Sequence, residues 1–178
     1  MLRRLATTLV AAALALAGVQ VAQVAPAQAA ARVLYYDASR AQEFVAVVNQ
    51  GAQIWNSKVG NVRLEPVPAG RTPDIRVYAD NGWPRTYTSS LGNGYWYMGR
   101  EAVVDGYFPP RIAAHEFGHI LGLPDNRTGR CTDLMSGSSA PVSCTNANPS
   151  TAEATTVNNI FRTTITVTVP AREFVWQP

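Results

Sequence analysis

The segment His115–Asp125 (HEFGHILGLPD) contains every histidine of a chain of 178 residues. Its two histidines lie four positions apart, so on a helix both imidazoles occupy one face and can reach a single cation. Pro109 and Pro110 precede the motif. Proline suits the first turn of a helix, because its missing N–H would be unpaired there anyway. Gly122 and Pro124 then favour a helix end. We therefore expect a metal-binding helix over this segment.

The residue types in the motif indicate a catalytic zinc site. Neutral imidazole is a good zinc ligand, and a catalytic site keeps three protein ligands and one water. His115 and His119 supply two ligands, and Glu116 lies where a carboxylate can take a proton from the metal-bound water. Since no histidine remains, the third ligand must be a carboxylate. Asp125 is the nearest, and Gly122 permits the left-handed turn that brings it back under the metal.

Each of these assignments has a simpler alternative. Asp125 lies in the sequence Pro-Asp-Asn, which forms a good turn by itself. Glu116 could be a solvated helix glutamate. Other acids could complete the metal shell, although their positions offer no comparable rationale: Glu101, Asp105 and Asp133.

Two further features follow the motif. Met135 lies in the sequence Leu-Met-Ser-Gly; a lone methionine usually fills a core, and a tight turn that presents it beneath the histidines is the specific alternative. Cys131 and Cys144 are the only cysteines. In an exported chain such a pair favours a disulfide, which contributes about 3 kcal/mol. Thiolate ligation of a metal is the alternative, and it would need additional ligands nearby.

Residues 1–29 have the pattern of a secretory signal peptide. Two arginines precede the apolar run Leu5–Val19, and Ala27–Ala29 has the small-x-small pattern of a cleavage site. A membrane anchor is the alternative, but Gly18 and Gln20 interrupt the apolar run. Without this segment 13 basic and 12 acidic residues remain. This balance supports neither nucleic acid nor a membrane surface as a partner.

The remaining chain suits one domain, which we place at residues 30–163, with residues 164–178 as an extension of unknown role. Alternation and helical spacing predict an α+β fold rather than repeated βαβ units. We expect strands at 32–36, 62–67, 75–79, 95–98 and 103–107, and helices at 42–58 (with Gly51 a weak spot), 109–122 and 150–163 (with Ser150 and Glu153 at its start). Polar loops are expected at 81–94 and 128–149, and residues 165–178 are expected to form an added strand or a loose tail.

These motifs together resemble the snapalysins, small neutral zinc metalloproteases of the metzincin clan. The resemblance runs from about Arg32 to Arg162 and includes Gly51–Ser57, Gly94–Met98, the Leu-Met-Ser-Gly sequence and the cysteine pair. Most metzincins carry histidine where this chain has Asp125, which makes the motif specific. The family fold would be a twisted, mostly parallel sheet with an edge strand, packed on a backing helix and an active-site helix, with a C-terminal helix.

The resemblance implies a role for each motif residue. It makes His115, His119 and Asp125 the ligands of one Zn²⁺, Glu116 the general base, Met135 the Met-turn residue and Cys131–Cys144 a disulfide. It also implies a secreted endopeptidase that favours an aromatic residue after the scissile bond. Snapalysins can hold Ca²⁺ through an acidic and a hydroxyl residue before the active-site helix. Phe108–Pro110 offers neither, so calcium is not expected at that position.

Other functions remain open from the sequence. A secreted binding module with a structural zinc would need a fourth protein ligand, and another zinc hydrolase could act on a non-peptide amide. For the peptidase, Tyr95 and Tyr97 could lie on an edge strand against which an extended peptide pairs. Their alternative role is ordinary aromatic packing within the sheet. We expect protein or peptide substrates and a monomer.

Overall fold

A computed structural model describes residues 30–162 and 171–176 of the chain. The expected signal peptide at 1–29 and the expected strand at 165–169 lie outside the described residues. Within the described part, no helix has the length and apolar character needed to cross a membrane.

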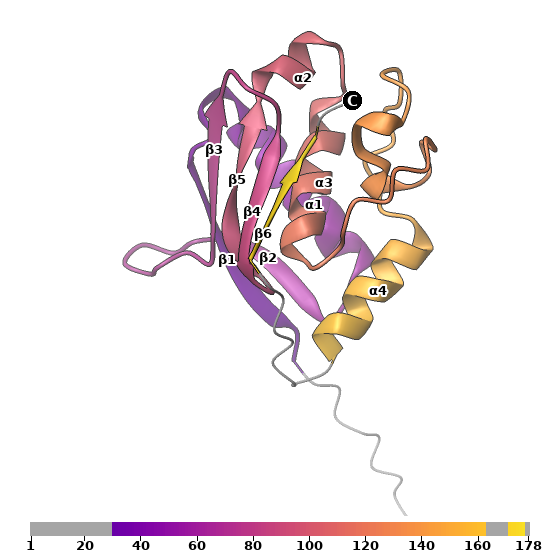
Figure 1. The fold of residues 1–178 in the computed structure, drawn as a ribbon. Helices are drawn as coiled ribbons and strands as arrows, with labels where there is room; N and C mark the ends of the chain where they lie inside the picture. Colours follow the sequence, from indigo (N-terminus) through magenta and orange to yellow (C-terminus); the bar gives the residue numbers. More distant parts are fainter. Residues whose placement is uncertain (1–29, 163–170, 177–178) are drawn as a thin grey trace, which may run out of the picture.

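One mixed sheet of six strands forms the centre of the fold, in the order β2-β1-β3-β5-β4-β6. The first four of these strands run parallel, whereas β4 pairs antiparallel with both β5 and β6. Helices α1 and α3 lie together on one side of the sheet (Figure 1). The strands are β1 (Arg32–Arg40), β2 (Val62–Pro66), β3 (Ile75–Asp80), β4 (Arg85–Ser90), β5 (Asn93–Gly99) and β6 (Arg172–Val175).

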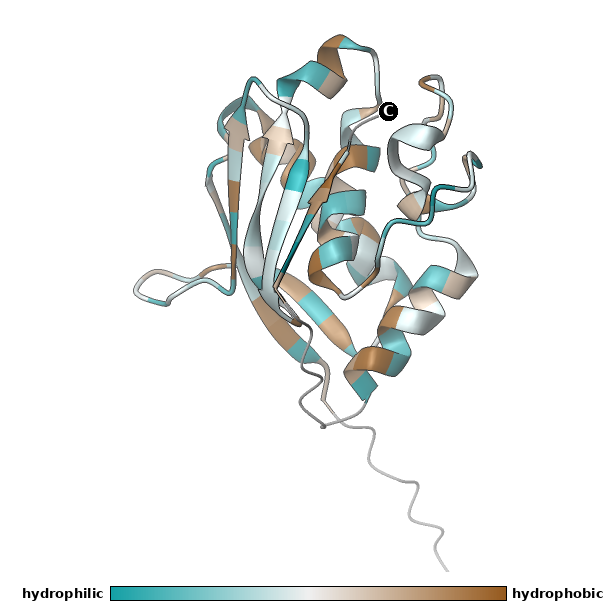
Figure 2. Cartoon of the chain, viewed as in Figure 1, coloured by the Kyte–Doolittle hydropathy of each residue, from teal (hydrophilic) through white to brown (hydrophobic). Residues whose placement is uncertain are grey.

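The helices of the described chain are α1 (Val45–Lys58), α2 (Arg100–Val104), α3 (Pro109–Ile120) and α4 (Thr151–Arg162), with short 3-10 helices at Gln42–Phe44 and Leu134–Ser139. Hydrophobic and hydrophilic residues are interleaved along strands and helices alike (Figure 2), as expected of elements that bury one face. The predicted α+β class and the expected backing, active-site and C-terminal helices are confirmed.

Helix α1 directly supports helix α3, which carries His115 and His119. Gly51 is not a weak spot but a contact point, because a Cβ added there would lie 3.0 Å from the Cβ of Ala113. The fully buried Trp55 donates a hydrogen bond from its indole Nε1 to the carbonyl of Ala114 at 2.7 Å. Close backbone approach and one buried hydrogen bond therefore fix α3 against α1.

Two predicted elements are wrong. The expected polar loop at 81–94 contains strand β4, in which Thr86 and Thr88 are buried. Threonine favours strands because of its branched Cβ, and its polarity concealed the inward-facing positions. The expected strand at 103–107 is absent. Helix α2 ends at Val104, which is 83% exposed, and a turn follows it. A strand there would have needed a pairing partner, whereas α2 satisfies its hydrogen bonds locally.

Candidate active site

Helix α3 and the turn after it bring three potential metal ligands together. The Nε2 atoms of His115 and His119 lie 3.0 Å apart. The chain reverses at Gly122, whose φ is 97°, and returns Asp125 so that its Oδ1 lies 3.3 Å and 3.6 Å from those two nitrogens. Among the described residues this is the one group of histidine, cysteine and acidic side chains close enough to share an ion.

The hydrogen bonds behind the imidazoles determine which way their lone pairs point. His115 Nδ1 lies 3.0 Å from the carbonyl of Leu134, and His119 Nδ1 lies 2.8 Å from that of Leu123. A carbonyl oxygen only accepts, so both Nδ1 atoms carry hydrogen and the Nε2 lone pairs face the common centre. Burial also lowers the pKa of His119 to about 3, which keeps that ring neutral.

The convergence of three lone pairs fits a cation. The carboxyl of Asp125 is partly buried, which opposes ionisation, but its contacts with His115 and His119 and the charge of Arg127 lower its pKa overall. Two imidazole lone pairs and a carboxylate oxygen repel one another unless a positive charge lies between them. Tetrahedral zinc with bonds of about 2.0–2.1 Å places its ligand atoms about 3.3 Å apart, close to the separations here.

Glu116 lies beside the ligands and is only 1% exposed. Its Oε2 accepts a hydrogen bond of 2.6 Å from the hydroxyl of Thr86 on β4, and its Oε1 has no partner within the described chain. Burial raises the pKa of this carboxyl to about 7. Glu116 is therefore not a solvated helix residue, and one of its oxygens is left free beside the ligand group.

Met135 lies beneath α3 in the 3-10 helix Leu134–Ser139 and is 1% exposed. It packs so closely against the helix that a Cβ added at Gly118 would come within 2.6 Å of its sulfur. The buried turn that presents Met135 to the histidine-bearing helix is thus present, and it also supplies the Leu134 carbonyl that orients His115.

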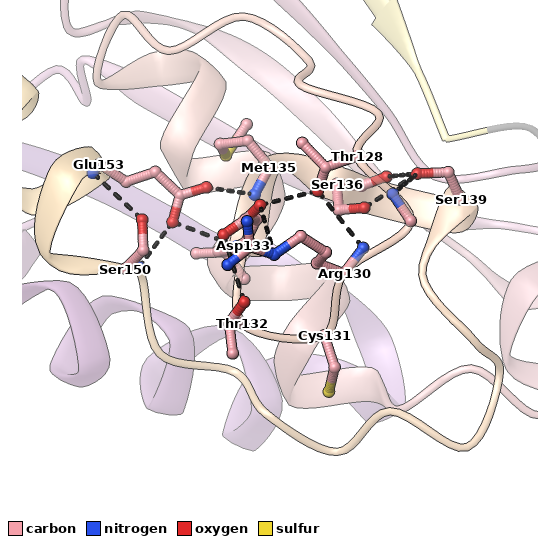
Figure 3. Close-up of polar contacts among 12 residues, drawn as sticks. Thr128, Arg130, Cys131, Thr132, Asp133, Met135, Ser136, Ser139, Ser150 and Glu153 are labelled. Atoms are coloured by element: carbon pink, nitrogen blue, oxygen red, sulfur yellow. Dashed lines mark hydrogen bonds and ion pairs between the residues drawn. The ribbon is translucent and has the colours of Figure 1, made fainter.

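A buried glutamate holds this turn in place. Glu153 accepts hydrogen bonds from the backbone N–H groups of Leu134 and Met135, at 3.1 Å and 2.7 Å, and from that of Ser150 at 2.6 Å. Figure 3 shows its carboxylate between the start of α4 and the turn. Glu153 therefore does more than cap its own helix, which is the role its position in the sequence predicts.

A buried arginine holds the preceding loop. Arg111, 2% exposed, donates to the carbonyls of Cys131 at 3.1 Å, Asp133 at 2.7 Å and Asn146 at 2.6 Å. The loop is closed by a disulfide between Cys131 and Cys144, as the resemblance implies. We call the turn Leu134–Ser139, together with Arg111 and Glu153, the floor of the site.

The competing third ligands lie elsewhere. Glu101 and Asp105 are exposed residues at α2. Asp133 accepts a hydrogen bond from Thr128 at 2.7 Å and pairs with Arg130 at 3.8 Å (Figure 3). The structure therefore brings only Asp125 of the four acids to the two histidines.

The expectation that Tyr95 and Tyr97 lie on an edge strand beside the site is wrong. Strand β5 pairs with β3 on one side and β4 on the other. Tyr95 stacks on Tyr87 with ring centroids 4.8 Å apart, on the face opposite to that of Trp96, which packs inward against Phe117. Hydrogen bonding on both sides removes β5 from the edge, and strand alternation points both tyrosines away from α3.

Sequence reasoning missed two aromatic residues that cover the two histidines. The ring of Phe174 stacks on His119 with centroids 4.0 Å apart, and Trp176 meets His115 edge-on at 4.5 Å. Their spacing of two, typical of one face of a strand, was the available signal. Arg111 offered another, since it lies one helical turn before His115 on the same face. Nothing in the sequence singles out Thr86.

Comparison with known proteins assigns the family. Residues 31–164 match the Streptomyces extracellular neutral proteinase (M7) family. Two relatives named extracellular small neutral protease, from Streptomyces lividans and Streptomyces sp. (strain C5), are 40% and 41% identical over 137 and 138 residues, 76% of this chain. The chain spans only 60% and 59% of their lengths. A third, from Streptomyces caespitosus, is 39% identical over 71% of this chain and 94% of its own length. The resemblance to the snapalysins is thereby confirmed, and the chain belongs to the Streptomyces extracellular neutral proteinase family.

Proposed function

We propose that this protein is a secreted, zinc-dependent endopeptidase, with a signal peptide at residues 1–29 and a protease domain at 30–163. The observation that carries the proposal is the convergence of the His115, His119 and Asp125 lone pairs beside the free oxygen of Glu116. Family membership and the extracellular relatives support the same conclusion.

The site residues divide the chemistry between them. Zinc held by the two histidines and Asp125 would lower the pKa of a coordinated water to about 7 and polarise the scissile carbonyl. The hydroxyl of Thr86 holds Glu116 Oε2 at 2.6 Å, which fixes the orientation of the carboxylate. We expect Glu116 Oε1, which has no other partner within the described chain, to receive the proton of the attacking water and to deliver it to the leaving amine.

We propose that the substrate lies along β4 rather than β5. Thr86, the partner of Glu116, belongs to β4, so a peptide paired antiparallel with this strand would pass the ligand group in an extended conformation. A preference for an aromatic residue after the scissile bond is consistent with the space beside His115, which accepts the indole ring of Trp176.

Chelation and substitution of Glu116 test the proposal together. We expect EDTA to abolish hydrolysis of casein by the purified chain and added Zn²⁺ to restore it. Glu116→Gln should still bind one zinc per chain. Its kcat/KM should fall by about 10²–10⁴-fold, because the substitution removes the proton acceptor. Glu101→Gln, which changes an exposed acid outside the site, serves as the matched control and should retain full activity.

Two results would reject the proposal. Hydrolysis retained by Glu116→Gln would exclude its role as general base. Zinc bound by the unaltered chain without cleavage of casein or peptides would identify a structural metal in a binding module.

A further inference from the structure

Strand β6 covers the outer edge of β4. Residues 172–175 pair antiparallel with residues 85–88, so that Phe174 lies opposite Thr86 and Val175 opposite Arg85. The backbone N–H of Trp176 continues the contact by donating to the carbonyl of Pro84 at 2.9 Å. In Figure 1, β6 is the yellow strand that lies between β4 and helix α3. This is the edge along which we place the substrate.

The side chains of β6 alternate between the two faces of the sheet. Phe174 shares the face of Thr86 and Glu116, and its ring lies parallel to that of His119, with an interplanar angle of 9°. Trp176 points the same way and is 1% exposed, packed against His115 and Tyr107. Both metal-ligating rings are therefore covered by aromatic side chains of one short segment.

Further contacts of this segment within the described chain lie near the surface. Glu173 faces away from α3 and accepts a hydrogen bond of 2.6 Å from the Tyr87 hydroxyl. Arg127 donates to the carbonyl of Val175 at 3.0 Å, and it also lies 3.8 Å from Asp125 Oδ2. Within residues 30–162 and 171–176, the segment is thus held by one edge pairing, two aromatic side chains and contacts that water can replace.

We propose that Arg172–Trp176 is an internal occupant of the substrate groove and restrains hydrolysis until it is displaced. The proposal rests on the proposed function. The segment occupies the β4 edge, runs antiparallel to it as we propose for the substrate, and places two rings over the ligand histidines. It also lies outside residues 31–164, the part of the chain that matches the family.

The expected size of the restraint follows from population arithmetic. A peptide can bind only those molecules in which the segment has left the groove. If about 1–10% of molecules are open, kcat/KM is lowered about 10–100-fold relative to a chain without the segment. At an effective concentration in the millimolar range, the same open fraction corresponds to a dissociation constant of about 10–100 µM for the free segment.

Activity measurements test the restraint. The zinc-loaded secreted chain is compared with a chain ending at Pro170 and with the double variant Phe174→Ala/Trp176→Ala, which remains informative if the shorter chain misfolds. Both should hydrolyse a peptide substrate about 10–100-fold faster in kcat/KM. Glu173→Gln alters the same strand on its outer face and should stay within twofold. Zinc content, circular dichroism and intact mass establish that each chain is folded, loaded and uncleaved.

A binding measurement tests the occupancy without relying on turnover. The peptide AREFVW (residues 171–176) is titrated by calorimetry into the zinc-loaded shortened chain carrying Glu116→Gln. We expect a dissociation constant of about 10–100 µM and weaker binding by the reversed sequence. The same peptide should inhibit the active shortened chain competitively.

The outcomes separate the two proposals. A folded, active shortened chain that is no faster than the full chain overturns the restraint, and so does the absence of peptide binding. If no chain hydrolyses peptides but AREFVW still binds, the peptidase function fails while the occupancy of the groove is supported.

Discussion

The floor contacts the two histidines from one side, and the segment Arg172–Trp176, which we call the roof, contacts them from the other. The two regions are built differently. The floor is held by charged side chains that are buried: Glu153 binds three backbone N–H groups and Arg111 four backbone carbonyls, the fourth being that of Leu134 at 3.4 Å. The roof is held by pairing at a sheet edge and by two aromatic rings.

The difference separates permanent support from reversible cover. Separating a buried charge from the peptide groups that it binds is costly in free energy, because water does not reach either partner to replace the lost hydrogen bonds. The floor therefore cannot open without unfolding its surroundings. Pairing at a sheet edge can be exchanged for water or for another extended chain, so the roof can leave while the floor stays in place.

The largest expected effect is on the floor. Arg111→Met keeps most of the side-chain volume but removes the charged donor shared by the carbonyls of Cys131, Asp133 and Asn146. The Asn146 carbonyl then has no donor within the described chain, whereas those of Cys131 and Asp133 keep one each, from Asn146 Nδ2 and the Ser136 N–H. We expect the free energy of unfolding to fall by about 3–5 kcal/mol in urea titrations with the disulfide intact. Arg63→Met, at an exposed position of β2, is the control and should change it by less than about 0.5 kcal/mol. A loss below 1 kcal/mol for Arg111→Met would contradict the description of the floor.

Glu153→Ala should have the next largest effect. It leaves the backbone N–H groups of Leu134 and Met135 buried and unpaired, at an expected cost of about 2–3 kcal/mol. Because Leu134 also orients His115, zinc affinity should fall, which competition with a chromogenic chelator measures. Glu153→Gln keeps one acceptor oxygen, so its stability and zinc affinity should lie between those of the unaltered chain and of Glu153→Ala. Unchanged zinc affinity in the alanine variant would separate the floor from the metal site.

Two buried tryptophans allow a direct comparison of core and roof. A segment that can leave on its own contributes no more to global stability than its own docking free energy, about 1–3 kcal/mol for an open fraction of 1–10%. Trp176→Ala should therefore cost about 1–2 kcal/mol, whereas Trp55→Ala, beneath α3, should cost about 3–5 kcal/mol. Equal losses in thermal or urea unfolding would make the roof part of the cooperative core.

The smallest expected effect concerns an ion pair at the start of β4, the strand that pairs with the roof. Asp80 pairs with Arg85 of β4 at 2.5 Å, and chiefly this hydrogen bond holds the pKa of Asp80 below its ordinary value. The pair stabilises the fold fully above the pKa of the unfolded chain, about 4, and the stabilisation is lost as pH falls through the lower folded pKa. Because both side chains are partly exposed, Asp80→Asn should cost less than about 1 kcal/mol at pH 7. Its difference from the unaltered chain should shrink in urea titrations as the pH is lowered below about 4; a difference that does not shrink would contradict the assignment.

The predictable parts of the molecule are those encoded locally. The spacing of His115 and His119, and the capping pair Ser150 and Glu153, place the active-site helix and α4 within a residue or two. The positive φ of Gly122 is likewise as the sequence predicts. Each of these features depends on a few neighbouring residues, so a single sequence contains enough information to find it.

The unpredicted parts depend on partners distant in sequence. Thr86 lies in a strand because β5 and β6 flank it, and it is a site residue because Glu116 lies 30 positions away across the interior. Phe174 and Trp176 reach the histidines only after β6 has joined the sheet. Short polar or terminal segments carry little local signal for such long-range pairing. This is why β4 was missed, and why an added strand within 165–178 was only one of two alternatives, with no contact to the histidines predicted.

The pairing of β6 with β4 has a consequence beyond the reaction. Once β6 departs, residues 85–88 present a row of bare amide and carbonyl groups, the kind of surface on which chains associate into dimers or fibrils. The sequence of β4, Arg-Thr-Tyr-Thr-Ser-Ser, is rich in hydroxyl groups and begins with a cation, which reduces that hazard. As long as β6 is paired, this edge is unavailable to other chains, so the same segment that covers the histidines also protects the sheet.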